Sequence, residues 1–290
     1  MSETLILGSE GYIGSALTHY LKGKITGIDI LNGVDYCSLE KDYISSFKNI
    51  ILLAGNSSVG SCNCEPHYSL NNNVVKFIKL IDKISTSQKL IYASSSSVYG
   101  NTNGAIATEE SNTFIPINYY DLTKYTIDCY AKLSSVEYYG LRFGTVNGKT
   151  KNSSLVRDDI MINAMMKNGI INGEIKSINP MTNRPILGII DLCRAVQTIL
   201  DGNDNRGIYN LASFNTNVFE VSEYIASKYN IKIESILDNS QKVYDFMISS
   251  DKFKNKYNFN FNDTIDSITD SIYIDFKNIK FIGRKECLKI

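Results

Sequence analysis

The stretch Thr4-Leu-Ile-Leu-Gly8-Ser-Glu-Gly11-Tyr12-Ile13-Gly14-Ser-Ala-Leu17 predicts a strand, a tight turn and the start of a helix. Such a turn needs glycine because one position takes a backbone conformation that other residues avoid, one lets a phosphate approach, and one lets the helix pack on the strand. The helix then offers N–H groups and the positive end of its dipole to an anion. The glycine spacing alone also fits a flexible turn. The pattern favours a dinucleotide site formed by Gly8, Gly11, Tyr12, Ile13 and Gly14.

A second short apolar segment, Ile25-Thr-Gly-Ile-Asp29, ends in an acid. It lies about twenty residues beyond the glycine turn, where a carboxylate can accept both hydroxyls of an adenosine ribose and repel a 2′-phosphate. On its own, Asp29 fits a turn or a cap equally well. Together with the glycine turn, it favours NAD over NADP as the cofactor.

The next segment, Gly33-Val-Asp35-Tyr36-Cys37, follows too closely to leave room for a crossover helix. The third strand of an ordinary doubly wound sheet is therefore expected to be short, rearranged or missing. Asp35 and Tyr36 then become candidates for the wall of an adenine pocket, and we include Asp35 among the cofactor-binding residues. Residues 38–47 predict a helix capped by Ser38.

Two apolar runs predict buried parallel strands. Residues 49–55 end in Leu53, Ala54 and Gly55, where small side chains permit close approach of a cofactor. Residues 88–93 run into Ser94-Ser95-Ser96-Ser97-Val98-Tyr99-Gly100. Hydroxyls just past the carboxyl end of a strand lie in the ligand crevice of an open sheet. A flexible serine-rich loop is the alternative, which the flanking apolar residues disfavour.

The segment Asn118-Tyr-Tyr120-Asp-Leu-Thr-Lys124 predicts the start of a helix with Tyr120 and Lys124 on one face. A lysine ammonium near a phenol favours the phenolate, which can take a proton from a substrate hydroxyl. A serine hydroxyl can hold the same oxygen. This spacing is also common on solvated helix faces, so the prediction depends on the ordered set of motifs that precedes it.

That ordered set resembles the extended short-chain dehydrogenase/reductase family, in its NAD-dependent nucleotide-sugar epimerase/dehydratase branch, over about residues 4–275. The resemblance implies that Ser95, three residues before Val98, is catalytic together with Tyr120 and Lys124, which also contact the cofactor. It further implies a cofactor contact from Asn73, although Lys76 and Phe77 depart from the family's pattern at this point.

The resemblance continues downstream through Leu141–Gly148, residues 157–163, residues 183–191 and residues 207–212. It implies substrate contacts from Ser96, Thr145, Arg157 and Arg184, with the Arg184 guanidinium suited to a diphosphate. Thr145 and Asn147 stand where many relatives have asparagine and tyrosine, and Gly188 replaces a histidine. A solvated turn arginine is the alternative for Arg184.

The implied architecture is α/β, a Rossmann-type doubly wound parallel sheet with a smaller C-terminal substrate-binding α/β region. Residues 1–150 would bind NAD, with about 186–209 returning to that domain. Residues 151–185 and 210–290 would bind the substrate. The family commonly forms homodimers through the two helices that carry Asn73 and Tyr120, so a homodimer is expected. The apolar residues that would serve this contact or the core are Leu70, Phe77, Ile81, Ile127 and Leu133.

The implied activity is hydride transfer between a sugar carbon and NAD, and an epimerase on a nucleotide-activated sugar is the first hypothesis. A nucleotide-sugar dehydrogenase or reductase is the alternative, and a non-catalytic NAD-sensing protein is the second alternative. A 4,6-dehydratase is not expected, because Ser96 and Ser97 stand where that reaction requires an acid pair.

The composition of the chain indicates which kinds of partner the protein is not expected to bind. The 290 residues carry 30 basic and 30 acidic side chains, so neither a nucleic acid nor a membrane surface is expected as partner. No signal pattern and no membrane-length apolar run is present, which predicts a cytoplasmic protein. Cys62 and Cys64 lack the spacing of a metal knuckle, and no metal is expected.

Overall fold

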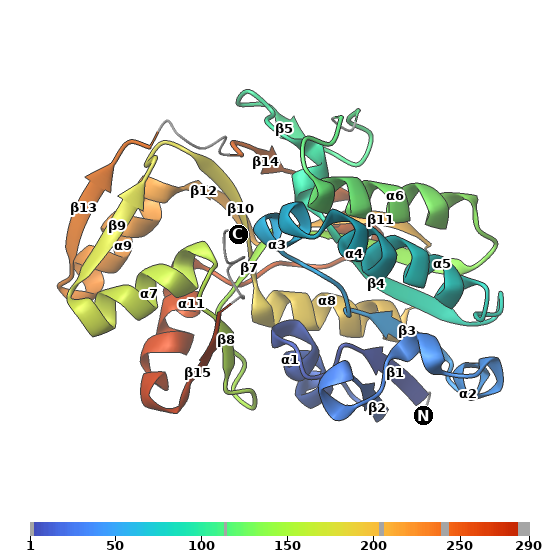
Figure 1. Cartoon of the computed structure of the whole chain (residues 1–290). Helices are drawn as coiled ribbons and strands as arrows, with labels where there is room; N and C mark the ends of the chain where they lie inside the picture. The colour runs from blue at the N-terminus through green and yellow to red at the C-terminus, as the bar shows by residue number, and fades with distance from the viewer. Residues whose placement is uncertain (1–2, 113–114, 203–205, 239–243, 284–290) are drawn as a thin grey trace.

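A six-stranded parallel sheet forms the centre of the computed structural model, which describes residues 3–112, 115–202, 206–238 and 244–283 (Figure 1). Its order is β11-β6-β4-β3-β1-β2. The strands are β1 (Glu3–Leu7), β2 (Lys24–Ile28), β3 (Asn49–Leu52), β4 (Lys89–Ser95), β6 (Glu137–Phe143) and β11 (Gly207–Leu211). The predicted Rossmann-type parallel sheet is confirmed. Because β1 has β2 on one side and β3 on the other, the chain reverses direction across the sheet at β1, where such folds bind ligands.

Successive residues of the inner strands pack into two different cores. Ile6, Ile51 and Ile91 belong to the cluster on one face, and Leu5, Ile50 and Leu90 belong to the cluster on the other. Both faces are buried, which is why these strands lack alternating polar residues.

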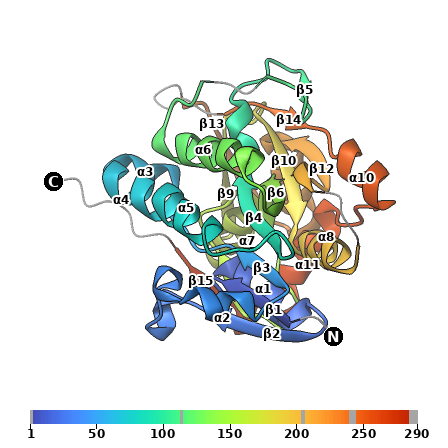
Figure 2. The same cartoon turned by 90° about the vertical axis from the view of Figure 1, so that its right-hand side faces the viewer.

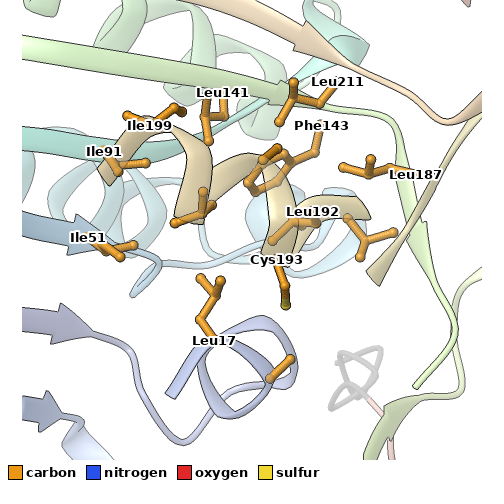
Figure 3. Packing of buried hydrophobic residues seen from close by; sticks show 14 of the residues in the cluster. Leu17, Ile51, Ile91, Leu141, Phe143, Leu187, Leu192, Cys193, Ile199 and Leu211 are labelled. Carbon is orange, nitrogen blue, oxygen red and sulfur yellow. The ribbon is translucent and has the colours of Figure 1, made fainter. Parts of the chain in front are cut away.

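Helices cover both faces of the sheet (Figure 2). On one face lie α1 (Tyr12–Tyr20) and α8 (Ile189–Asp201), and Figure 3 shows Leu192 and Cys193 of α8 among Leu17 of α1 and the strand residues Leu141 and Phe143. The other face is covered by α2 (Lys41–Ser45), α5 (Lys76–Ile81) and α6 (Tyr119–Leu133). The crossover from β3 to β4 also contains α3 (Val59–Cys64), α4 (Pro66–Leu70) and a π-helical turn, η3 (Asn71–Val75).

The sheet ends at β2, as the short connection after Asp29 predicts. Within the described residues, the segment between β2 and β3 forms two 3₁₀ turns, η1 (Ile30–Asn32) and η2 (Tyr36–Ser38), and α2, with no strand. The expected helix over residues 38–47 is wrong at its start. Asp35 rather than Ser38 acts as a cap, because its carboxylate accepts the Cys37 N–H and the Ser38 hydroxyl donates to the Asp35 carbonyl. The helix therefore begins only at Lys41.

Smaller sheets and helices form the rest of the molecule. They comprise η4 (Ser96–Tyr99), β5 (Ile106–Ala107), β7 (Thr145–Asn147), β8 (Leu155–Arg157), α7 (Met161–Asn172), β9 (Glu174–Ile178), β10 (Asn183–Gly188), β12 (Phe214–Asn217), α9 (Val218–Tyr229), β13 (Lys232–Ile236), β14 (Met247–Ile248), α10 (Asp251–Tyr257), α11 (Ile265–Tyr273), η5 (Phe276–Asn278) and β15 (Lys280–Ile282). Strands pair as β12-β10-β7, β13-β9, β14-β5 and β15-β8. Helices α7, α9 and α11 share a separate apolar core, while α10 packs on β11.

The apolar residues proposed for either a dimer or the core differ in their burial. Phe77, Ile81 and Ile127 are buried in the core cluster beneath α5 and α6. Leu70 is partly buried against the same cluster, and Leu133 at the end of α6 is 90% exposed.

A buried ion pair connects α6 to the sheet. Arg142 of β6 donates through Nε to Asp128 of α6 at 2.8 Å and through a second nitrogen to the Tyr99 hydroxyl at 2.7 Å. Tyr99 donates to Asn210 of β11 at 2.9 Å, and Tyr92 of β4 donates to Asp128 at 3.1 Å. Both charged side chains are almost fully buried, so each depends on the other for compensation of its charge.

We expect Asp128→Ala to lower the free energy of unfolding by about 3–5 kcal/mol, because the Arg142 guanidinium would stay buried without its carboxylate. Glu3→Ala, which removes an exposed ion pair with Lys24, should change it by no more than about 1 kcal/mol. Urea denaturation of both variants measures the difference. Similar losses in the two variants would contradict a structural role for the buried pair.

Candidate functional site

One cavity of about 770 Å³ lies at the carboxyl ends of the central strands, a volume within the range of small-molecule sites. Its walls come from the glycine turn, the ends of β2, β3 and β4, the start of α6, and β7 and β10. The site residues predicted from sequence that line it are Gly8, Gly11, Tyr12, Ile13, Gly14, Asp29, Asp35, Leu53, Ala54, Gly55, Ser95, Ser96, Tyr120, Lys124, Thr145, Arg157 and Arg184. Asn73 is the one predicted site residue that does not line it.

The glycine turn has little room for side chains. Gly8 has a φ of +97°, and a Cβ there would lie 2.5 Å from the Ala54 nitrogen. A Cβ at Gly14 would lie 1.9 Å from the Gly8 carbonyl oxygen, so α1 packs directly on the turn. At Gly11 the nearest contact would be an ordinary 3.6 Å. Gly11 precedes the first residue of α1 and borders the cavity, so its missing side chain leaves space at the N-terminus of the helix. This cradle fits a dinucleotide pyrophosphate.

Asp29 is fixed at the end of β2 by two backbone groups. One carboxylate oxygen accepts the Glu10 N–H at 3.0 Å, and the other accepts the Leu31 N–H at 3.0 Å. Asp29 therefore ties the glycine turn to the strand. Each oxygen keeps a further lone pair that can accept a hydroxyl.

Asp35 lies further along the same wall in an ion pair with Lys76 of α5, with 2.5 Å between Nζ and the carboxylate. Burial acts to raise the pKa of Asp35, but hydrogen bonds from Lys76 and the Cys37 N–H outweigh it and lower the pKa. Lys76 also lines the cavity. Its role was not predicted from sequence, because the pairing joins residues far apart in the chain.

Asn73 lies behind the cavity wall, in the π-helical turn. Its side-chain oxygen accepts the Asn56 N–H at 2.7 Å, and its amide donates to the Asn56 carbonyl at 2.8 Å and to the Thr123 hydroxyl at 3.1 Å. The expected cofactor contact from Asn73 therefore stays a prediction. Asn73 holds the loop after Gly55 against α6.

Tyr120 and Lys124 face the cavity from the first turns of α6. The Lys124 side chain is buried, donates to the Ala93 carbonyl at 2.7 Å, and places Nζ 5.8 Å from the centre of the Tyr120 ring. Ser95 stands at the end of β4, where its oxygen accepts the Ser97 N–H at 3.2 Å and lies 2.8 Å from the Ser97 hydroxyl oxygen. Both serines line the same cavity as Tyr120.

The side chains expected to contact a substrate differ in the hydrogen bonds that they already make within the protein. The Ser96 hydroxyl donates to the Phe143 carbonyl at 2.8 Å, and Arg157 makes two hydrogen bonds to Asp159 at 2.9 and 2.8 Å. Each group keeps further hydrogen-bonding capacity, the Ser96 oxygen as an acceptor and Arg157 through its remaining N–H groups, and both residues line the cavity. Arg184 donates to the Asn183 carbonyl, and burial lowers the pKa of Arg184 to about 10.

Tyr244 and Phe246 also line the cavity and were missed. They follow directly on residues 239–243, which lie outside the described residues, and they approach the site only through the tertiary fold.

In the part of the chain that the structure describes, no group of three His, Cys, Asp or Glu side chains is placed to hold a metal ion. The helices described are all too short or too polar to cross a membrane.

These features define a Rossmann-type protein with a dinucleotide cradle and a Ser, Tyr and Lys set in one cavity. Residues 4–212 match the model of the NAD dependent epimerase/dehydratase family. The chain belongs to this family.

Two curated relatives show the range of similarity in sequence. Protein CapI of Staphylococcus aureus is 29% identical over 181 residues, which cover 50% of this chain and 54% of that protein. The chain thus matches only about half the length of CapI. An ADP-L-glycero-D-manno-heptose-6-epimerase of Brachyspira hyodysenteriae is 26% identical over 261 residues, 78% of this chain and 80% of that protein.

Two solved structures show the same fold at low identity. The NAD-dependent NDP-hexosamine 5,6-dehydratase TunA superposes with a TM-score of 0.84 at 17% identity, over 97% of this chain and 99% of that one. UDP-glucuronic acid 4-epimerase from Bacillus cereus, in complex with UDP-glucuronic acid and NAD, gives 0.81 at 18% identity, over 95% and 99%.

We expect Gly14→Ala and Gly11→Ala to separate the two functions of the glycine turn. Gly14→Ala should destabilise the fold by roughly 1–3 kcal/mol, because its methyl group meets the Gly8 carbonyl. Gly11→Ala should leave the melting temperature almost unchanged and weaken NAD binding, because its methyl group occupies the space left for the phosphate. Thermal melts and NAD titrations measure both. Unchanged NAD affinity in Gly11→Ala would refute the cradle.

We expect Asp29→Asn to reduce the preference for NAD over NADP by about tenfold, which corresponds to 1.4 kcal/mol, since the charge that repels a 2′-phosphate is removed. Asp42→Asn is the matched control, because it removes an exposed acid of α2 that does not line the cavity. Its effect on the preference should be smaller than about threefold. Competitive titration of both nucleotides measures the ratio, and a wild-type protein that prefers NADP would contradict the argument.

Proposed function

We propose that the protein is an NAD-dependent nucleotide-sugar epimerase that acts by transient hydride transfer, with Ser95, Tyr120 and Lys124 at the reacting carbon. The observation that carries this proposal is the shared cavity. The glycine cradle, the end of β4 and one face of α6 all contribute to its wall, so the catalytic set borders the space where a nicotinamide dinucleotide fits.

Each catalytic side chain has a distinct task. Tyr120 takes the proton from the sugar hydroxyl as that carbon is oxidised and returns it when the carbon is reduced. Lys124, anchored on the Ala93 carbonyl, places its positive charge beside the Tyr120 ring and favours the phenolate. Ser95 holds the reacting oxygen through a hydrogen bond. When bound, NAD supplies a reversible hydride acceptor.

The nucleotide diphosphate is assigned to Arg184. Its guanidinium borders the cavity, is partly buried, and has no carboxylate within ion-pair distance among the described residues. A diphosphate would supply the missing negative charge through paired hydrogen bonds. Residues 151–185 and 210–290 would then form the substrate-binding region, and Thr145 would face the sugar.

The two alternatives remain distinguishable from this proposal. A dehydrogenase or reductase of the same family would use the same three residues and release an oxidised or reduced sugar. A protein that only senses NAD would not need Tyr120 and Lys124 on the cavity, and their placement there favours an enzyme.

We also propose a homodimer through the exposed apolar side chains of α4, η3 and α6, which are Tyr68, Val75, Tyr119 and Leu133.

The experiment is incubation of the purified protein and NAD with a panel of UDP-, GDP-, dTDP-, CDP- and ADP-sugars. Nicotinamide absorbance and product identity are followed together. An isomerised sugar without net NADH supports the epimerase. Accumulation of NADH with an oxidised sugar would establish the dehydrogenase, and NAD binding without any turnover would favour the sensing protein.

We expect Tyr120→Phe to lower kcat by at least about 10²-fold, since general acid–base catalysis contributes about 10²–10⁴-fold. NAD affinity should stay within about threefold of wild type, because the ring remains. Tyr119→Phe, at the exposed neighbouring position, is the control and should retain full turnover. Retention of turnover by Tyr120→Phe would refute the catalytic assignment.

A further inference from the structure

A buried acid lies within the Tyr120–Lys124 motif itself. Asp121, in the first turn of α6, is 1% exposed. Among the described residues no ion pair involves its carboxyl group, and no charged side chain is a cause of its pKa shift. A buried ionised carboxylate without a cationic partner is unfavourable, and this burial favours the neutral form of the group.

Asp121 is linked to the catalytic serine through one intervening hydroxyl. The Ser97 oxygen lies 2.6 Å from Asp121 Oδ1 and 2.8 Å from the Ser95 oxygen. On its other side, Asp121 Oδ2 accepts from the Asn118 amide at 2.7 Å and from the Tyr244 hydroxyl. The result is a continuous chain from Tyr244 and Asn118 through Asp121 and Ser97 to Ser95.

This hydrogen-bonded chain has two states, which differ in the protonation of Asp121 and in the direction of the serine hydrogen bonds. An ionised Asp121 only accepts, so the single Ser97 proton goes to Asp121 and the Ser95 proton must lie between the two serine oxygens. Ser95 then cannot donate into the cavity without leaving two oxygens 2.8 Å apart with no proton between them. A neutral Asp121 with its proton on Oδ1 donates to Ser97, Ser97 donates to Ser95, and the Ser95 proton is released toward the cavity.

The neutral state also satisfies the other carboxyl oxygen. Oδ2 of a carboxylic acid keeps its acceptor capacity, so it still accepts from Asn118 and Tyr244. Every polar group of the chain then has a partner within it except the Ser95 proton, which faces the cavity. Such an aligned chain of donors is strengthened in a buried environment.

We propose that Asp121 is a positioning residue that works as a neutral acid, whose proton orders Ser97 and thereby makes Ser95 a hydrogen-bond donor to the reacting sugar oxygen. This inference rests on the proposed function for the identity of that oxygen. Asp121 does not line the cavity, so it acts through the two serines. A donor at Ser95 is the polarity that a developing sugar ketone requires.

The net effect of the surroundings is to raise the pKa of Asp121, which is the direction that favours this state. Burial raises the pKa of Asp121, opposed by hydrogen bonds from Ser97, Tyr244 and Asn118. The titratable neighbours are Tyr120 and Lys124 on the same helix and the Tyr244 phenol, whose own pKa is raised by burial and by Asp121. Lys124 bonds to the Ala93 carbonyl, while Arg184 and Asp245, which interact electrostatically with each other, flank the side of Tyr244.

The sign of the pH dependence follows from the raised pKa. The acid is neutral below its pKa in the folded protein, so the donor chain is present there. It is lost as the pH rises through that pKa, and kcat for wild type should fall across this interval. Asp121→Asn has no titrating group at this position and should lack this limb of the profile.

Three variants separate a proton-donating role from a merely structural one. In Asp121→Asn the amide nitrogen donates to Ser97 and the amide oxygen accepts from Tyr244, so kcat should stay within about threefold of wild type. Asp121→Ala and Ser97→Ala break the chain and should lower kcat by roughly tenfold or more with little change in KM. Melting temperatures control for folding. If Asp121→Asn loses as much kcat as Asp121→Ala, the carboxylate works in its charged form and the proposal is overturned.

Infrared spectroscopy tests the protonation state without any substrate. The difference spectrum of wild type minus Asp121→Asn at neutral pH should contain the carbonyl stretch of a protonated carboxylic acid, which is separate from the carboxylate bands. A difference spectrum with only carboxylate bands would overturn the proposal. If wild type turns over none of the nucleotide sugars, the proposed function fails, while the infrared result still decides the state of Asp121.

Discussion

The buried ion pair between Arg142 and Asp128 is the interaction on which the relative placement of β4, β6 and α6 depends. It ties α6 to β6, and through Tyr99 and Asn210 it also holds η4 and β11. The serine-rich segment at the end of β4 and helix α6, which carries Tyr120, are therefore held in position relative to one another. Loss of one partner of a charge pair buried this deeply is strongly destabilising, so the network opposes displacement of α6 from the sheet.

The cofactor side of the cavity is shaped by contacts of a different kind. Close backbone packing at Gly8 and Gly14 sets the turn, and Asp29 joins that turn to β2 through the Glu10 N–H. Since the sheet ends at β2 in the described chain, this wall is completed by short turns and by the Asp35–Lys76 pair. The glycine turn and the neighbouring wall of the cavity are thus held by contacts of different kinds.

Sequence reasoning succeeded where the signal is local. The glycine spacing, the apolar runs of β3 and β4 and the four-residue interval from Tyr120 to Lys124 are each set by neighbouring residues, and the parallel sheet follows from them. Contacts that depend on a distant partner could not be predicted. Asn73 hydrogen-bonds to Asn56 and does not line the cavity, and the Ser96 hydroxyl donates to the Phe143 carbonyl. The Asp121 and Tyr244 contact joins segments more than a hundred residues apart, which no local pattern reveals.

One cavity is proposed to hold both the dinucleotide and the side chains of Ser95, Tyr120 and Lys124. A crystal structure of the protein grown with NAD would show where the cofactor binds. We expect the pyrophosphate at the N-terminus of α1, the adenosine ribose at Asp29 and the nicotinamide ring beside Tyr120. A dinucleotide bound elsewhere, or a nicotinamide ring turned away from Tyr120 and Ser95, would contradict this proposal.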